Sequence, residues 1–401
     1  MQLTGEKGKV GTVSNKCINR SIVACINERA FDFIGVVLTP WHARMAAASY
    51  LKLRSNGLVN SGILLIDRHS KDGYLISPDA FDSDLEVAYL GRNGDSFAAM
   101  IQALVCRLLL PLFQSKKDKG RMVYIANPSF PGSIFDSFAA LKLDCRFSYI
   151  LLDEGIGSYL SSDEDWAKQS IKDRGLHGIG ASLRSLLSKY EQKKMPKLIC
   201  ELKDKQRFKK FYLFEDDGSI NSANASFVKR CFELNCKKED ASRLALNKEY
   251  EGAVVYCSQF PLVESGSISL AAHLRAVEVA YRVSKQLEVP FVIKLHPRES
   301  DLSIYAEFDA CIDSRRGVAL EDILGSLNSP PLCISSLCST AMITATAVFD
   351  CCGIGLSGLV PKEEFSASFL QFCEKMNAVF GSYYKRPLTI KEFCAFLQRC
   401  N

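Results

Sequence analysis

The sequence predicts an α/β chain with two Rossmann-like domains facing a central cleft. Short apolar runs alternate with helix-prone stretches twice along the chain, once before and once after residue 240. Such alternation is typical of parallel sheets wrapped by helices. The length of 401 residues also exceeds that of one typical domain. We therefore expect an N-terminal domain at 1–240, a C-terminal domain at 250–385, and a terminal helix at 386–401 that packs back on the N-terminal domain.

The first half contains a series of apolar runs that predict buried strands after an irregular lead-in at residues 1–30. These runs lie at 33–38, 62–66, 87–90, 122–126, 147–152 and 211–214. Helices are expected at 41–53 and 95–114, and residues 160–250 are more polar and form the connection between the halves.

The second half repeats this alternation. Its predicted strands lie at 252–257, 289–295, 310–312, 331–334 and 347–350, and its predicted helices at 268–287, 317–327 and 390–400.

Composition indicates a soluble protein. The chain is 47% hydrophobic and 24% charged, which is ordinary for globular proteins. No apolar run reaches the roughly 18 residues that span a bilayer, and the N-terminus lacks the apolar stretch of a signal peptide. The 16 cysteines are scattered through apolar segments with no CxxC pair, which favours reduced, structural thiols. We therefore expect a cytoplasmic location.

Positive charge is concentrated in two stretches. Residues 181–210 hold ten basic and three acidic residues, a larger excess than the net charge of +5 for the whole chain. Residues 116–121 hold a second basic cluster. A polyanionic partner, an anionic membrane surface or a solvated helix face would each account for these stretches. We expect no nucleic-acid partner.

The first motif with chemical potential is Asp153-Glu154-Gly155, directly after a predicted strand. Ligands of open α/β sheets bind at the carboxyl ends of strands, so this position suits a functional loop. Adjacent residues at a strand end point to opposite sides, so one carboxylate would face the cleft while the other holds the loop. A carboxylate in the cleft could take a proton from a sugar hydroxyl. A plain surface turn is the alternative, because Asp and Gly are turn residues.

The second motif is His296-Pro297, which closes another predicted strand. Lys294, Arg298 and Glu299 flank it. An imidazole that can carry a proton, placed among basic residues, suits a phosphate-bearing leaving group. A structural histidine beside the strand end is the alternative.

A third segment combines hydroxyls with a predicted helix start. Its hydroxyl residues are Ser335, Ser336, Ser339 and Thr340. Hydroxyls and free backbone N–H groups at a helix N-terminus form an anion site, whereas simple helix capping would need the same residue types.

Several motifs of other enzyme classes are absent from the sequence. It contains no GxxxxGK[ST] loop, no GxGxxG at 33–40, no HExxH and no GxSxG. The sequence therefore argues against a P-loop enzyme, a dinucleotide site, a metalloprotease-type metal site and an α/β-hydrolase.

Together, these three motifs resemble those of bacterial sialyltransferases in order and spacing. The acidic-acidic-Gly, His-Pro and Ser/Thr motifs of that group correspond to 153–155, 296–297 and 335–340. The context Leu152-Asp153-Glu154-Gly155-Ile156-Gly157-Ser158-Tyr159 looks like lipooligosaccharide sialyltransferases and capsule polysialyltransferases, and Thr39-Pro40-Trp41-His42 is similar to their opening loop.

The resemblance implies a GT-B fold, CMP-sialic acid as the donor, and inversion without a metal or other cofactor. It implies that Glu154 is the general base, that His296 meets the departing phosphate and that Pro297 belongs to the donor-binding site. The hydroxyls that hold this phosphate would come from Ser336, Ser339 and Thr340, although the pair Ser335-Ser336 fits the motif as well as Ser339-Thr340. Asp153 would then position its loop.

The sequence therefore predicts a sialyltransferase that acts on a bacterial surface glycan, such as a lipooligosaccharide, O-antigen or capsule. The basic stretches would suit an anionic acceptor or peripheral docking on the inner membrane. Two alternatives are left open: a GT-B transferase with another nucleotide-activated donor, and a catalytically silent protein that binds glycans or polyanions.

Overall fold

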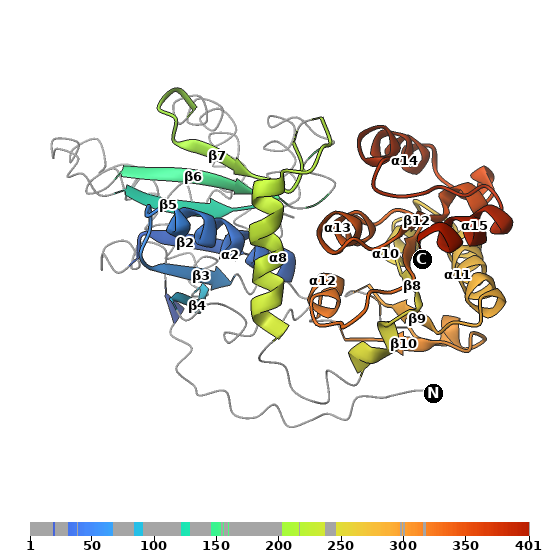
Figure 1. Cartoon of the computed structure of the whole chain (residues 1–401). Coiled ribbons are helices and arrows are strands. Elements are labelled where there is room, and N and C mark those ends of the chain that lie inside the picture. The colour runs from blue at the N-terminus through green and yellow to red at the C-terminus, as the bar shows by residue number, and fades with distance from the viewer. Residues whose placement is uncertain are drawn as a thin grey trace, which may run out of the picture. The chain divides into compact units, whose positions relative to one another are not determined.

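The chain forms two compact units in a computed structural model (Figure 1). We call residues 14–71 with 76–213 the N-terminal unit, and residues 214–401 with 1–13 and 72–75 the C-terminal unit. The structure describes residues 19–20, 31–37, 39–66, 84–90, 122–128, 146–153, 155, 159, 203–215, 217–236, 246–296, 299, 301–315 and 318–400.

The N-terminal unit is built on a seven-stranded parallel sheet in the order β1-β4-β3-β2-β5-β6-β7. Counted from β2, the order is 3-2-1-4-5-6, which is that of a Rossmann fold. The strands are β1 (Asn19–Arg20), β2 (Phe33–Val37), β3 (Gly62–Ile66), β4 (Leu85–Leu90), β5 (Met122–Asn127), β6 (Arg146–Leu152) and β7 (Phe208–Phe211).

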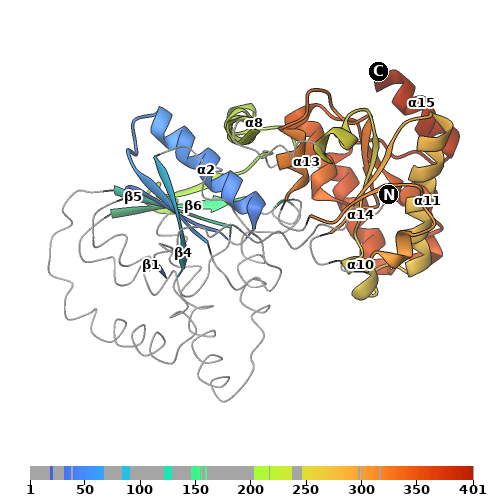
Figure 2. The same ribbon diagram turned by 90° about the horizontal axis from the view of Figure 1, so that it is seen from below.

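Helix α2 (Pro40–Ser55) covers one face of this sheet and contacts β2, β3, β5 and β6 (Figure 2). Thr39 caps its start, because the Thr39 side chain accepts a hydrogen bond from His42 N at 3.2 Å, and Pro40 follows as the first helical residue. Gly35 on β2 permits the close packing of the helix, since a Cβ there would lie 3.1 Å from Ala46 Cβ on α2.

The C-terminal unit repeats the plan with a five-stranded parallel sheet in the order β10-β9-β8-β11-β12. Counted from β8, the order is 3-2-1-4-5, again that of a Rossmann fold. The strands are β8 (Val254–Cys257), β9 (Phe291–Lys294), β10 (Cys311–Asp313), β11 (Cys333–Ser336) and β12 (Gly353–Gly355).

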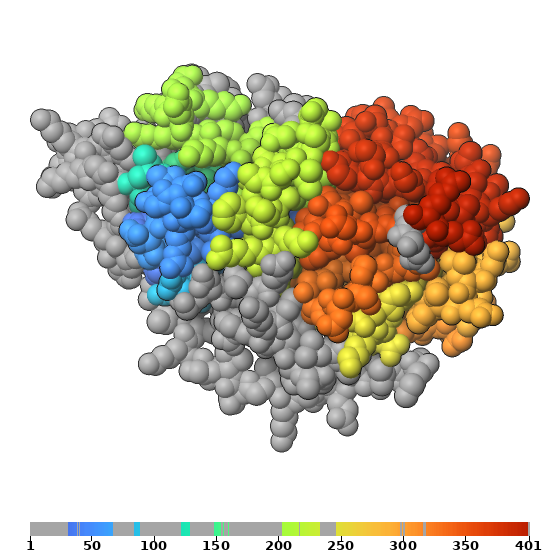
Figure 3. Space-filling view, in the orientation of Figure 1, coloured from blue at the N-terminus to red at the C-terminus, as the bar shows by residue number. Residues whose placement is uncertain are grey.

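Helices of the C-terminal unit cover its sheet. Helix α11 is capped by Ser269, whose hydroxyl accepts from Ala272 N at 2.9 Å, and it packs on β8 and β9. Helix α8 packs beside α12 and α13, as the space-filling view shows (Figure 3). The helices and short turns are α8 (Ser222–Cys236), η4 (Lys248–Tyr250), α10 (Pro261–Glu264), α11 (Leu270–Gln286), η5 (Ser303–Tyr305), α12 (Leu320–Leu324), α13 (Thr340–Phe349), η6 (Leu356–Leu359), η7 (Lys362–Glu364), α14 (Ala367–Phe380) and α15 (Ile390–Cys400).

The terminal helix α15 packs against α11. Cys394 Sγ on α15 lies 3.5 Å from Gln286 Oε1 at the end of α11. The domain boundaries predicted from the sequence, the packing of 386–401 on the N-terminal domain and the central cleft stay predictions.

The predicted α/β class with two Rossmann-like sheets is confirmed. The strand predicted at 347–350 is wrong, because Ala347, Val348 and Phe349 form the end of α13 and the chain re-enters the sheet only at β12. Seven of the ten residues of α13 are apolar and none of the ten is exposed, so its sequence lacks the polar face that marks a helix. The helix predicted at 95–114 lies outside the described residues.

Candidate active site

The loop after β6 is held closed by the carboxylate of Asp153. This residue follows the strand directly and is 1% exposed. Its Oδ1 accepts a hydrogen bond from Gly155 N at 2.5 Å, and its Oδ2 accepts from Leu213 N at 3.2 Å and from the Tyr159 hydroxyl. The backbone N–H of Asp153 donates in turn to Phe211 O at 3.2 Å. The carboxylate of Asp153 therefore links the loop after β6 to Leu213, which follows β7.

Burial raises the pKa of Asp153 to about 6, while the hydrogen bonds from Tyr159, Gly155 and Leu213 act in the opposite direction. The loop needs a glycine two residues on, since the φ angle of Gly155 is +103°. The Tyr159 ring packs edge-on against Tyr212 with 5.2 Å between centroids. These contacts give Asp153 a structural part in the motif.

Glu154 lies outside the described residues, and its assignment as general base stays a prediction. Its two chain neighbours, Asp153 and Gly155, are joined by the 2.5 Å hydrogen bond described above. The main chain on both sides of Glu154 is therefore held by Asp153.

The loop after β9 carries His296 and is closed by a different carboxylate. Leu295 is buried, whereas His296 is half-buried. Glu299 N donates to His296 O at 2.9 Å, and His296 N donates to Glu299 Oε2 at 3.3 Å. Glu299 is 3% exposed, so the tie lies inside the protein. Pro297 lies outside the described residues, and its predicted part in donor binding stays a prediction.

Lys294, beside this loop, forms a hydrogen bond and an ion pair within the C-terminal unit. Its Nζ donates to Arg315 O at 2.8 Å and lies 3.8 Å from Asp313 Oδ2. Asp313 also accepts from Arg315 Nη2 at 2.8 Å and from the Tyr250 hydroxyl at 2.7 Å. Burial opposes the ionisation of Asp313, but these hydrogen bonds and the nearby cations lower its pKa to about 2. Lys294 thus supports the sheet edge through an ion pair.

The hydroxyls of Ser335 and Ser336 are directed into the sheet. Ser335 Oγ donates to Val255 O at 2.9 Å and Ser336 Oγ donates to Cys257 O at 3.0 Å. Both serines are fully buried on β11. Each hydroxyl hydrogen is therefore engaged by a carbonyl of β8.

Ser339 and Thr340 lie at the start of α13, where an anion would be favoured. Ser339 caps the helix, since its Oγ accepts from Ala341 N at 3.3 Å. Gln259 holds the preceding turn by donating to Cys338 O and accepting from Cys338 N at 2.7 Å. Of the two serine pairs left open by the sequence, the geometry favours Ser339-Thr340 for an anion, and the assignment stays a prediction.

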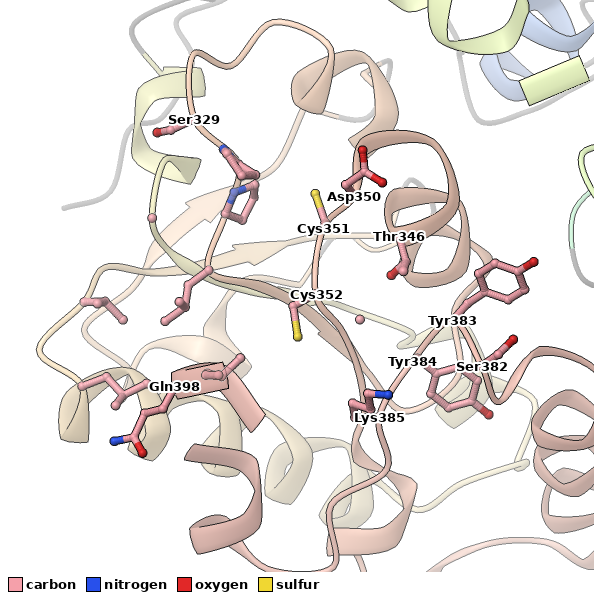
Figure 4. Close-up of a pocket in the computed structure, with 18 residues that line it drawn as sticks. Ser329, Thr346, Asp350, Cys351, Cys352, Ser382, Tyr383, Tyr384, Lys385 and Gln398 are labelled. Carbon is pink, nitrogen blue, oxygen red and sulfur yellow. The ribbon is translucent and has the colours of Figure 1, made fainter. Parts of the chain in front are cut away.

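A cavity of about 800 Å³ lies at the amino-terminal edge of the strands in the sheet of the C-terminal unit. Its lining includes Gly252, Val289 and Leu332, which precede β8, β9 and β11. Figure 4 shows its labelled side chains, among them Cys352 and Lys385. His296 and the hydroxyl residues at 335–340 do not line this cavity.

The described part of the basic stretch lies on β7 and the turn before it. Lys203, Lys205, Lys209 and Lys210 are exposed. Three of them lie over aromatic rings: Lys203 Nζ is 5.5 Å from the Phe208 centroid, Lys209 Nζ 5.9 Å from that of Tyr124, and Lys210 Nζ 5.3 Å from that of Tyr212. The basic cluster at 116–121 lies outside the described residues.

The described residues show neither a metal cluster nor a membrane-spanning helix. They contain no group of three or more His, Cys, Asp or Glu side chains arranged to hold a metal ion. Among the same residues, no helix is both long and apolar enough to cross a bilayer. The predicted absence of a cofactor and the predicted cytoplasmic location both stay predictions.

Sequence reasoning named Glu299 only as a flanking charge and missed Ser258 and Gln259. Both missed residues directly follow β8 at the carboxyl edge of the sheet. That position is the one that led to the other motifs, so the strand-end rule could have found them. Nothing in the sequence pairs Glu299 with Ser258, because 41 residues separate them.

A family model described as Alpha-2,8-polysialyltransferase (POLYST) matches residues 33–356. No protein with a curated function matches the chain.

Three solved structures illustrate the similarity of fold. UDP-GlcNAc 2-epimerase from Methanocaldococcus jannaschii is 11% identical, with a TM-score of 0.46 over 92% of this chain and 91% of that one. The GT-B domain of the sialyltransferase from Photobacterium damselae is 12% identical, with a TM-score of 0.41 over 88% and 99%. The 2,6-sialyltransferase from Photobacterium sp. JT-ISH-224, solved with CMP and lactose, is 11% identical, with a TM-score of 0.42 over 88% and 78%.

Proposed function

The chain belongs to the alpha-2,8-polysialyltransferase family and is a glycosyltransferase that transfers sialyl groups, and we propose that it takes sialic acid from CMP-sialic acid and joins it to a glycan hydroxyl with inversion. The observation that carries this proposal is the placement of the three motif loops. They lie at or just after the ends of β6, β9 and β11, at the carboxyl edges of two Rossmann-like sheets. Those edges are where open α/β sheets bind their ligands.

In this reaction Glu154 accepts the proton of the acceptor hydroxyl. The freed oxygen forms a bond to the anomeric carbon while the bond from that carbon to the CMP phosphate breaks. A single displacement of this kind inverts the anomeric configuration. A positioned carboxylate contributes on the order of 10²- to 10⁴-fold as general base. Asp153 supports this role, because its hydrogen bonds hold the main chain on either side of Glu154.

His296 stabilises the phosphate of CMP as it leaves, by donating a hydrogen bond or a proton. Its half-buried side chain follows a buried strand, so it combines access with a fixed backbone. Stabilisation of developing charge by placed donors is commonly among the largest contributions to catalysis. Pro297 restricts the backbone of the same loop.

The start of α13 binds the same phosphate through Ser339, Thr340 and the backbone N–H groups of the first turn. The N-terminal end of a helix carries partial positive charge, which favours an anion there. Ser335 and Ser336 contribute indirectly by fixing the end of β11 to β8. Helix N-terminus and imidazole together supply the electrostatic stabilisation that a Lewis-acid metal provides in other transferases, so we propose a metal-independent reaction.

The acceptor in this proposal is an anionic surface glycan. The exposed lysines on and before β7 support it, because they would attract a negatively charged chain. Peripheral docking on an anionic membrane would use the same charges.

The proposal is tested by incubating the protein with CMP-sialic acid and a panel of galactosyl and sialyl acceptors, with and without EDTA. We expect CMP release coupled to a sialylated product whose new linkage has the opposite anomeric configuration by NMR, at an unchanged rate in EDTA. Failure to release CMP with every acceptor in the panel would contradict sialic acid transfer. Turnover of another nucleotide-activated donor instead would favour a different GT-B transferase, and binding without turnover of any donor would favour a glycan-binding protein.

A further inference from the structure

A chain of buried hydrogen bonds runs from the loop of His296 into the core of the C-terminal unit. Its centre is the carboxylate of Glu299, which is 3% exposed. Oε2 accepts from Ser258 Oγ at 2.6 Å and from His296 N at 3.3 Å, and Oε1 accepts from the Tyr305 hydroxyl at 2.5 Å. His273 continues the chain, since its Nε2 lies 2.8 Å from the Tyr305 hydroxyl.

The direction of each hydrogen bond follows from the carboxylate, which can only accept. Tyr305 uses its one hydroxyl hydrogen on Glu299, so His273 must donate to it from Nε2. His273 Nδ1 is then the acceptor for Tyr256, whose hydroxyl lies 3.4 Å away. Burial lowers the pKa of His273 to about 4, which agrees with a neutral ring that donates from one nitrogen and accepts at the other.

The members of this chain come from four parts of the unit. Ser258 follows β8, His273 lies on α11, Tyr305 ends η5, and Glu299 belongs to the loop after β9. Ser258, His273 and Tyr305 are buried, at 4%, 0% and 0% exposure. Glu299 thus connects the main chain of His296 to rigid elements on both sides of the loop.

We infer that Glu299 is a positioning residue for His296: its buried carboxylate, held by Ser258 and Tyr305, fixes the main chain from which the imidazole meets the departing phosphate. This inference rests on the proposed function. A displacement of about 1 Å at a reacting group can lower a rate by about 100-fold. Loss of the tie should therefore lower kcat more than it changes the KM for the donor, because His296 acts chiefly in the transition state.

Glu321 provides a matched control. It is also a buried glutamate, at 6% exposure, and it accepts a hydrogen bond from Thr344 Oγ1 at 2.6 Å. It lies on α12 and has no hydrogen bond to the loop of His296 among the described residues. Substitution of Glu321 therefore reports the cost of replacing a buried glutamate in this unit without removing a hydrogen bond of that loop.

The test compares Glu299→Leu, Glu299→Gln and Tyr305→Phe with Glu321→Leu and Glu321→Gln in the full chain. Glu299→Leu removes the acceptor for His296 N, and we expect kcat to fall about 100-fold with little change in KM. Glu299→Gln restores a neutral acceptor for that N–H and should recover about tenfold of the loss. Tyr305→Phe should lower kcat about tenfold, and the two Glu321 variants by less than threefold, at a similar loss of thermal stability.

A second readout needs no activity. In protein labelled with ¹⁵N-histidine, which has five histidines, the His296 amide proton should resonate downfield because of its carboxylate acceptor. It should shift upfield in Glu299→Gln and stay in place in Glu321→Gln. These two glutamine variants keep the test decisive if a leucine variant fails to fold.

Active wild-type protein whose Glu299 variants lose no more kcat than the matched Glu321 variants would overturn the inference and leave the proposed function standing. An unmoved His296 amide resonance in Glu299→Gln would also overturn it. Wild-type protein that releases no CMP with any acceptor would overturn the proposed function instead.

Discussion

The loops after β6 and β9 are built alike, but the buried carboxylate stands at a different position relative to the proposed catalytic residue in each. In each, a buried carboxylate accepts a backbone N–H and the hydroxyl of a tyrosine six residues further on: Asp153 with Tyr159, and Glu299 with Tyr305. Asp153 directly precedes the proposed general base. Glu299 follows the proposed phosphate partner, His296, by three residues.

This difference shows that one motif can contain two roles: a residue that holds the loop and a neighbouring residue that takes part in the reaction. A buried carboxylate whose oxygens are filled by hydrogen bonds serves as a loop tie, and the neighbouring residue can then be fixed for chemistry. Asp153 forms its hydrogen bonds at the ends of β6 and β7, so the link that it provides is confined to the sheet edge. Glu299 bonds through Tyr305 to His273, so its tie extends to a core helix.

We expect the largest effect at Glu154, the residue next to Asp153. Glu154→Gln should lower kcat by about 10²- to 10⁴-fold, because the acceptor hydroxyl loses its base. Asp153→Asn is the matched control, and it should lower thermal stability with a smaller loss of kcat. Initial rates of CMP release and melting temperatures measure both. A larger kcat loss in Asp153→Asn than in Glu154→Gln would reverse the two roles.

The second loop should show the same separation with a smaller effect. His296→Asn should lower kcat by about 100-fold, because the leaving phosphate loses a donor that strengthens in the transition state. Its melting temperature should stay close to that of the wild type, since the side chain is only half-buried. Steady-state kinetics and thermal unfolding test this, and equal losses of activity and stability would make His296 a structural residue.

The tie at Asp153 should also be visible in the pH dependence of stability. Its pKa rises from 3.8 to about 6 on folding because burial disfavours the charge. Protonation therefore stabilises the folded state fully below about pH 4, and this contribution is lost as the pH rises through about 6. This rise in the pKa of Asp153 corresponds to about 3 kcal/mol.

Urea unfolding of the wild type and Asp153→Asn from pH 4 to pH 7 measures this contribution. The stability of the wild type relative to the variant should decrease over that range, while contributions from other groups cancel in the difference. A difference independent of pH would show that Asp153 keeps its ordinary pKa.

The smallest effect distinguishes two serines near the end of β11. Ser336→Ala and Ser339→Ala should each lower stability by about 1 kcal/mol, the first through a lost hydrogen bond to Cys257 O and the second through a lost helix cap. Only Ser339→Ala should weaken CMP binding, by about tenfold, as expected for one hydrogen bond to a charged group. Calorimetric titration with CMP tests this, and equal affinities would remove Ser339 from the phosphate site.

Most of the sheet framework was predictable because its strands are buried on both faces and read as continuous apolar runs. The runs at 33–38 and 62–66 became β2 and β3 almost without change. The same rule failed at 347–350, where a buried helix is as apolar as a strand. Periodicity cannot separate the two in so short a run.

The two alternating α/β series and the placement of acidic, His-Pro and hydroxyl motifs at strand ends can be read from the amino-acid sequence, since both are local properties of the chain. What each side chain does at those ends depends on contacts between distant residues. Asp153 is a tie because Leu213, 60 residues away, presents its N–H to it. Ser336 faces a carbonyl 79 residues away because β11 pairs with β8 in the 3-2-1-4-5 order. Such partners are set by strand order and register, which bring distant residues to one edge of a sheet.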